Sequence, residues 1–108
     1  MTKITGRNKS TSDEADVGTG VTLNSTTSVV IAAANADRTF FHVDGNFSEK
    51  ASWIKLQAAS IDDDKKGIWL NEKEKGGTSW TMPVDNIYTG EISGIADSGS
   101  PILYVTEY

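Results

Sequence analysis

Few residues of this chain belong to the types that perform chemistry, and their spacing does not build a reactive site. His42 is the only histidine, which excludes a multi-histidine metal site within one chain. The aspartates of 62–64 are contiguous and two lysines follow them, whereas a calcium loop needs alternating acidic ligands, a glycine and a closing glutamate. Gly18-Thr19-Gly20 lacks the strand and helix of a phosphate loop. We therefore predict no catalytic, metal-binding or cofactor-binding residue.

Composition narrows the possible partners. The 108 residues suffice for one domain. A net charge of −5 is the opposite of what phosphate neutralisation requires, so nucleic acid is not an expected partner. The chain has no cysteine for a disulfide or thiolate site. It also has no apolar stretch near the roughly 20 residues of a membrane helix, so we expect no membrane partner.

The first twenty residues differ from the rest of the chain. Met1–Gly20 is polar and nearly devoid of large apolar side chains, so burial cannot offset the entropy lost on ordering. We predict a flexible N-terminal arm over residues 1–20, followed by one domain over 21–108. The arm either orders against a partner or has no role.

The domain is predicted to be all-β. The stretch Thr27–Gly45 contains two apolar runs around the corner Asn35-Ala36-Asp37-Arg38, and we expect these runs to form a hairpin. Further runs alternate in the same way, and turn residues separate them at intervals of about ten residues. The expected strands are Val21–Asn24, Ser28–Ala33, Thr39–Val43, Ala51–Ala58, Gly67–Leu70, Thr78–Met82, Glu91–Ile95 and Ile102–Glu107.

About eight short antiparallel strands predict a single β-sandwich, jelly-roll-like in form. Side chains alternate between the two faces of a strand, which indicates which of them enter the core. The predicted core consists of Val29, Ile31, Phe41, Val43, Ile54, Leu56, Ile68, Leu70, Trp80, Met82, Ile92, Leu103 and Val105.

The same strand phases direct four aromatic side chains away from the core: Phe40, Trp53, Trp69 and Tyr104. Large exposed aromatic residues are unusual on a single-core domain unless another surface covers them, and interfaces are rich in such residues. We take these four as the candidate oligomer or partner interface. Alternatively, a bulge shifts the strand phase, or the arm or a loop of the same chain covers these side chains.

Several motifs together resemble small β-sandwich virion proteins of tailed bacteriophages. An Ala-Ala-Asn-x-x-Arg corner is followed by Ile-x-Leu, by Gly-Ile-x-Leu, by a Gly-Gly loop before an aromatic-x-apolar strand, by Tyr-Thr-Gly and by a terminal Glu-Tyr. The resemblance covers about residues 27–108. The residues that carry it are Ala33, Ala34, Asn35, Arg38, Ile54, Leu56, Gly67, Ile68, Leu70, Gly76, Gly77, Trp80, Met82, Tyr88, Thr89, Gly90, Glu107 and Tyr108.

This resemblance implies a structural protein without enzymatic activity. The expected role is a capsid decoration or stabilisation protein on the outside of the virion head, made in the host cytoplasm. The expected partners are the major capsid protein and further copies of the chain, which would form a homotrimer. The base of a head fibre, or a tail or connector component, is the other structural role that the resemblance implies.

A different class of function also fits the aromatic residues. In a small carbohydrate-binding sandwich, Trp53, Trp69 and Tyr104 would form one platform for sugar rings. Solvent access separates the two hypotheses, because a sugar platform must stay open whereas a subunit interface must be covered.

Overall fold

The computed structural model describes residues 16–60 and 65–108. These residues contain no α-helix, and one turn of 3₁₀ helix, η1 (Lys73–Lys75), follows the fifth strand. No described segment is a helix long and apolar enough to cross a membrane. The strands are β1 (Asp16–Thr22), β2 (Val29–Ala32), β3 (Phe41–Asp44), β4 (Ser52–Lys55), β5 (Ile68–Leu70), β6 (Ser79–Thr81), β7 (Ile92–Ala96) and β8 (Ile102–Glu107).

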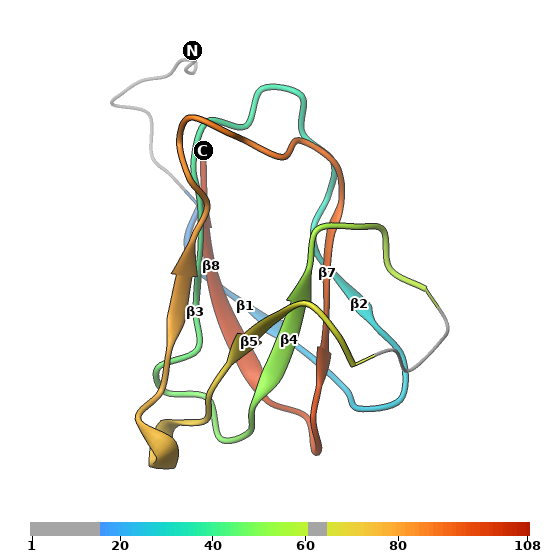
Figure 1. The fold of residues 1–108 in the computed structure, drawn as a ribbon, viewed down its shortest axis with the longest axis vertical. Coiled ribbons are helices and arrows are strands. Elements are labelled where there is room, and N and C mark those ends of the chain that lie inside the picture. The colour runs from blue at the N-terminus through green and yellow to red at the C-terminus, as the bar shows by residue number, and fades with distance from the viewer. Residues whose placement is uncertain (1–15, 61–64) are drawn as a thin grey trace.

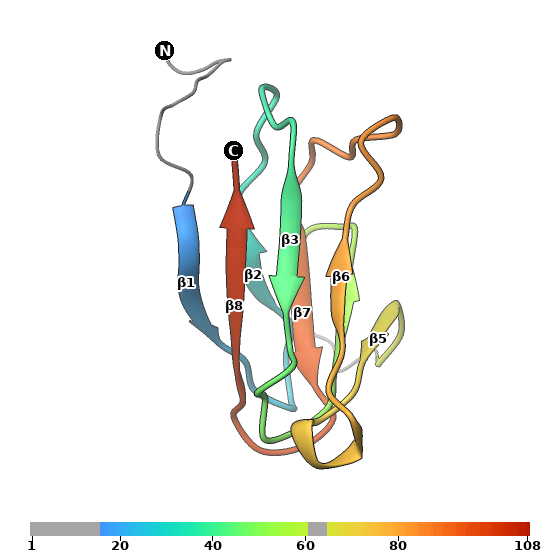
Figure 2. The ribbon, with the colours of Figure 1, turned by 90° about the vertical axis from the view of Figure 1, so that its left-hand side faces the viewer.

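The strands form two antiparallel sheets of four (Figure 1). The first sheet has the order β1-β8-β3-β6 and faces the viewer in Figure 2, and the second has the order β2-β7-β4-β5 and lies behind it. Strands pair from the two ends of the chain inward, as β1 with β8, β2 with β7, β3 with β6 and β4 with β5. This is the strand order of a jelly roll. The predicted all-β sandwich is confirmed.

Two details of the predicted organisation are wrong. Thr27–Gly45 does not form a hairpin, because β2 belongs to the second sheet and β3 to the first; its corner carries the chain from one sheet to the other. In addition, β1 begins at Asp16, so Asp16, Thr19 and Gly20, assigned to the arm, pair with β8, with a register shift between Asp16 and Thr19. The remainder of the predicted arm, residues 1–15, lies outside the described residues.

The core lies between the sheets and follows the predicted alternation. The side chains of Phe41, Ile54 and Leu103 are completely buried, and burial of each such side chain stabilises the fold by roughly 1.5–3 kcal/mol. Of the predicted core residues, all but Leu56 are buried or pack against the core. Leu56 is exposed because β4 ends at Lys55 and the chain bends there. Leu23, just beyond β1, was not among the predicted core residues and is also buried.

The connections gather at the two ends of the sandwich (Figure 1). One end, which we call the latch end, carries the β2–β3 and β6–β7 connections and Tyr108. The other end carries the β1–β2, β3–β4, β5–β6 and β7–β8 connections. The long β4–β5 connection lies to the side of the second sheet, on the right of Figure 1.

Candidate functional site

Arg38 places a charged guanidinium group inside the latch end, with only 3% of the residue exposed. Its Nε donates a hydrogen bond to Glu107 Oε2. Nη1 donates to the carbonyl oxygens of Tyr88 at 2.7 Å and Gly90 at 3.0 Å, and Nη2 donates to the carbonyl oxygen of Ala33 at 2.8 Å. Four of the five guanidinium N–H groups are thus satisfied, as burial of this charge requires. We call this cluster the arginine latch.

Further hydrogen bonds join the same segments of the chain. The backbone N–H of Asn35 donates to Thr89 O at 2.8 Å, and the N–H of Phe40 donates to Tyr108 O at 2.9 Å. The Phe40 ring stacks on Tyr108, with 4.8 Å between the ring centroids. The Ala-Ala-Asn-x-x-Arg, Tyr-Thr-Gly and Glu-Tyr motifs, which are far apart in the sequence, therefore meet in one place. Their role in this chain is to close one end of the sandwich.

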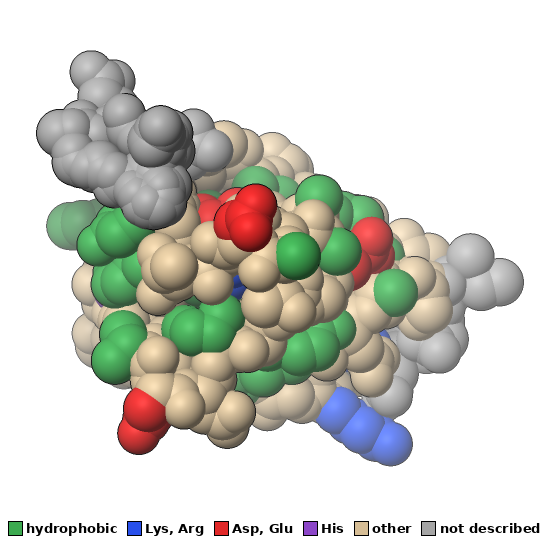
Figure 3. All heavy atoms as spheres, turned by 90° about the horizontal axis from the view of Figure 1, so that it is seen from above, with side chains coloured by type: hydrophobic (Ala, Val, Ile, Leu, Met, Phe, Trp, Pro, Cys, Tyr) green, Lys and Arg blue, Asp and Glu red, His purple; other side chains and the backbone are tan. Residues whose placement is uncertain are grey.

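The outer surface of the latch end is partly apolar. Seen from above, hydrophobic side chains are distributed among the loops of this end (Figure 3). Val84 and Tyr108 are 73% and 53% exposed, and three alanines of the β2–β3 connection, Ala33, Ala34 and Ala36, are also exposed. This surface offers modest apolar contacts around a rigid, hydrogen-bonded core.

The two tryptophans of the candidate interface form a pair on the outer face of the second sheet. Trp53 and Trp69 are directly opposite each other on β4 and β5, and their rings meet edge to face with 4.7 Å between centroids. Ile54, next to Trp53 in β4, points into the core, so both rings point outward. Trp53 is half-buried, whereas Trp69 is 45% exposed.

Part of that outer face is covered by the chain itself. Ile95 pairs with Trp53 and so shares its outer face, yet Ile95 is completely buried. The β4–β5 connection lies across this face, where the N–H of Ser60 donates to Ser28 Oγ at 2.8 Å and the N–H of Ala59 donates to Glu91 Oε2 at 2.7 Å. These hydrogen bonds hold Ala59 and Ser60 beside Ser28 and Glu91, while Trp69 stays accessible.

The other two candidate residues lie elsewhere. Tyr104 is on β8, on the outer face of the first sheet, and is 44% exposed. Phe40 is half-buried at the latch end, stacked on Tyr108. The structure therefore brings Trp53 and Trp69 together but separates them from Tyr104 by the full thickness of the sandwich. The three residues cannot form one sugar platform.

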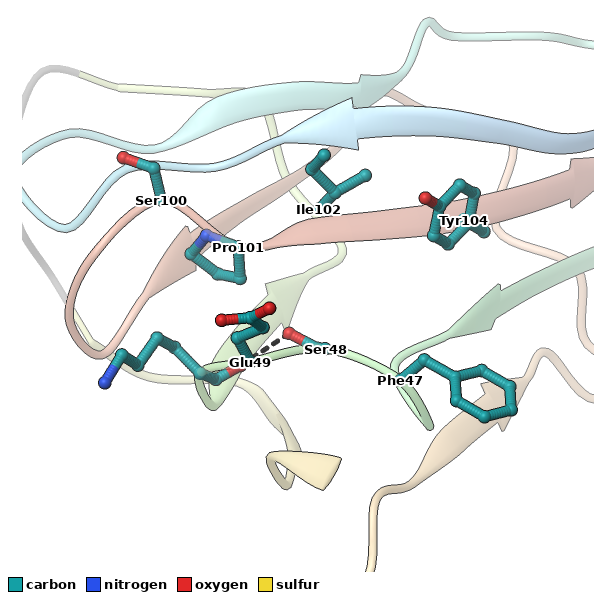
Figure 4. Close-up of a pocket in the computed structure, with 8 residues that line it drawn as sticks. Phe47, Ser48, Glu49, Ser100, Pro101, Ile102 and Tyr104 are labelled. Carbon is teal, nitrogen blue, oxygen red and sulfur yellow. Dashed lines mark hydrogen bonds between the residues drawn. The ribbon is translucent and has the colours of Figure 1, made fainter. Parts of the chain in front are cut away.

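A groove of about 350 Å³ borders Tyr104. One side is formed by the start of β8 and the residues before it, and the other by the β3–β4 connection (Figure 4). We call it the Tyr104 groove. It is lined by Phe47, Ser48, Glu49, Lys50, Ser100, Pro101, Ile102 and Tyr104. Apart from Tyr104, sequence reasoning missed these residues. The available signal was Phe47, a large aromatic side chain within a polar turn.

The structure also places His42, and it contains no metal site among the described residues. His42 lies on the first sheet, where its Nδ1 is 2.7 Å from Thr81 Oγ1. Neither residue is buried. The aspartate run 62–64 lies outside the described residues. Within residues 16–60 and 65–108, no group of His, Cys, Asp and Glu side chains is arranged to hold a metal ion.

Comparison with known proteins identified no similar protein. The chain matches no protein-family model, no curated protein and no solved structure.

Proposed function

We propose that this chain is a structural protein of a tailed-bacteriophage virion, bound to the outside of the head as a capsid decoration or stabilisation protein. Its partners would be the major capsid protein and copies of itself, in a homotrimer. One observation carries the proposal: large apolar side chains are exposed at three separate places on a small folded domain.

The three places are distinct parts of the fold. Trp69 lies on the outer face of the second sheet, Tyr104 and Ile102 lie on the first sheet, and Val84 and Tyr108 lie at the latch end. A protein that binds one ligand needs one such surface. A subunit of a shell contacts several neighbours at once, and apolar side chains at several places would serve such contacts.

The proposal also rests on the resemblance of the sequence to phage virion proteins. Three of the motifs that carry this resemblance meet at the arginine latch and close one end of the sandwich.

Among the exposed surfaces, the tryptophan pair is the best candidate for self-association. It is a compact aromatic cluster on β4 and the short edge strand β5 of the second sheet. Aromatic residues in this setting are typical centres of binding energy in protein interfaces. Trp69 of this pair is open to solvent.

We predict that Trp69→Ala dissociates the oligomer while the monomer stays folded. The side chain is 45% exposed on a three-residue strand, so its loss costs the fold little, whereas loss of a central interface tryptophan costs about 2 kcal/mol or more of binding. Light scattering after size exclusion should show the wild-type mass at three times 11.6 kDa and a monomer for the variant.

Lys75→Ala is the control for this experiment, since Lys75 is exposed in η1 and belongs to none of the three apolar places. Its mass should equal that of the wild type. Trp69→Ala with the wild-type mass and undiminished capsid binding would eliminate the tryptophan pair as an interface.

A further inference from the structure

We propose that the Tyr104 groove binds a neutral saccharide chain. This site is separate from the tryptophan pair and on the opposite sheet, so the proposal does not depend on the virion role. The proposed sugar site is the groove beside Tyr104. It is not a joint platform of Trp53, Trp69 and Tyr104.

The apolar lining of the groove matches the faces of sugar rings. Tyr104 and Ile102 point out from β8 on one side, and Phe47 extends from the β3–β4 connection on the other (Figure 4). Phe47 is 78% exposed and Tyr104 is 44% exposed, so both rings are open to a ligand. Aromatic side chains offer large, rigid apolar faces at low entropic cost. The C–H faces of a pyranose ring can pack against such surfaces.

The polar lining supplies both kinds of hydrogen-bonding group. Figure 4 shows the Glu49 carboxylate between the Pro101 side of the groove and Ser48. Glu49 accepts hydrogen bonds, the Lys50 ammonium group donates them, and the Ser100 hydroxyl does both. A sugar hydroxyl is itself both donor and acceptor. A groove that combines apolar side chains with convergent polar groups is typical of small-ligand sites.

The charges near the groove favour a neutral ligand. Lys50 lines the groove with Glu49, and Lys73 Nζ lies 4.0 Å from Glu49 Oε2. These two lysines outnumber the one carboxylate, so no excess of negative charge is present to attract a cation. The net charge of −5 of the whole chain disfavours a phosphate or another anion. A hydroxyl-rich ligand without charge satisfies both conditions.

The groove is held in shape before any ligand arrives. On the β3–β4 connection, the N–H of Gly45 donates to Thr78 O at 3.0 Å and the N–H of Lys73 donates to Ser48 O at 2.8 Å. Ser48 Oγ also donates to Lys50 O at 2.6 Å, as drawn in Figure 4. A preorganised site loses less entropy on binding. Because of these hydrogen bonds, the turn that carries Phe47 is more constrained than an ordinary surface loop.

The test is a titration of the full-length ¹⁵N-labelled chain with neutral oligosaccharides, namely maltotetraose, cellotetraose, chitotetraose and mannotetraose. We expect at least one of them to shift the amide signals of Phe47, Glu49 and Tyr104 in a saturable manner. Tyr104→Ala should weaken that binding about tenfold, because a stacking contact of about 1.4 kcal/mol corresponds to that factor. Phe47→Ser, in an exposed turn, is the second variant and should weaken binding in the same direction.

Leu56→Ala is the matched control, because it removes an exposed apolar side chain that follows β4 of the other sheet. It should leave saccharide binding unchanged. The proposal is overturned if none of the four sugars produces saturable shifts at the groove, or if both groove variants bind as the wild type does. It is also overturned if the groove variants lose capsid binding and leave sugar binding intact, since the groove would then be a protein contact.

Discussion

Replacing Arg38 with methionine is expected to lower the free energy of unfolding by about 3 to 5 kcal/mol, the usual cost of removing one partner of a buried ion pair. The methionine fills similar volume but donates no hydrogen bond. It leaves the Glu107 carboxylate and the carbonyl oxygens of Ala33, Tyr88 and Gly90 without the donor that they now share. Urea denaturation at fixed protein concentration measures this change.

Two further variants test the separate contributions of Arg38 and Glu107 to the arginine latch, and a third serves as a surface control. Arg38→Lys keeps the charge but loses the planar fork, so its loss should be smaller than that of Arg38→Met. Glu107→Gln keeps an acceptor for Nε and should cost the least, about 1 to 2 kcal/mol. Lys75→Met removes an exposed charge and should change stability by less than about 0.5 kcal/mol. If Arg38→Met unfolds at the wild-type urea concentration, the latch does not stabilise the fold.

Replacing Gly77 with alanine is expected to cost about 3 kcal/mol, from backbone strain together with a close backbone contact. Gly77 has a φ of 55°, and a Cβ there would lie 2.5 Å from Asn46 O and 2.8 Å from Asn46 Cα. Either the β5–β6 connection or the turn that carries Phe47 must move to relieve this contact. The variant should therefore also weaken ligand binding at the Tyr104 groove.

The neighbouring Gly76 provides the control. Its φ of 104° is less favourable for alanine than that of Gly77, but nothing lies within 4 Å of a Cβ at this position. Gly76→Ala should cost about 1 kcal/mol. If strain in φ alone decided the cost, Gly76→Ala would be the more damaging change. Thermal unfolding that shows Gly76→Ala to be as destabilising as Gly77→Ala, or more so, would therefore show that the contact between Gly77 and Asn46 is unimportant.

The strands and their inward faces were largely predictable from the sequence because both follow from local alternation. The prediction for β8 is the clearest case, since Leu103 and Val105 are buried while Ile102 and Tyr104 are exposed. The assignment of Leu56 failed for a local reason too. Alternation continues through it, and only the bend after Lys55 removes it from the sheet.

Pairing between distant strands was not predictable by the same means. The corner at Asn35–Arg38 has the residues of a tight turn, and turn chemistry does not tell a hairpin from a crossing between sheets. The start of β1 was missed because Asp16–Gly20 has few apolar residues, and its pairing with β8 comes from backbone hydrogen bonds. The sequence alone also gave no reason to bury Arg38, whose partners are 5 to 69 residues away.

The candidate site was predictable only in part. The strand phase correctly directs Trp53, Trp69 and Tyr104 outward, but phase gives the face of a strand and not the sheet to which it belongs. Only the strand order separates Tyr104 from the tryptophan pair. The Tyr104 groove depends on the β3–β4 connection lying beside the start of β8, a tertiary contact for which the sequence has no local pattern.

The most direct test of the proposed function is the number of copies of this chain per virus particle, measured by quantitative mass spectrometry with the major capsid protein as internal standard. A decoration protein that covers the shell as trimers should be present in on the order of hundreds of copies, in proportion to the capsid protein. About a dozen copies would instead indicate a connector, tail or vertex-fibre position. Complete absence from purified particles would contradict the virion role and leave saccharide binding as the function to pursue.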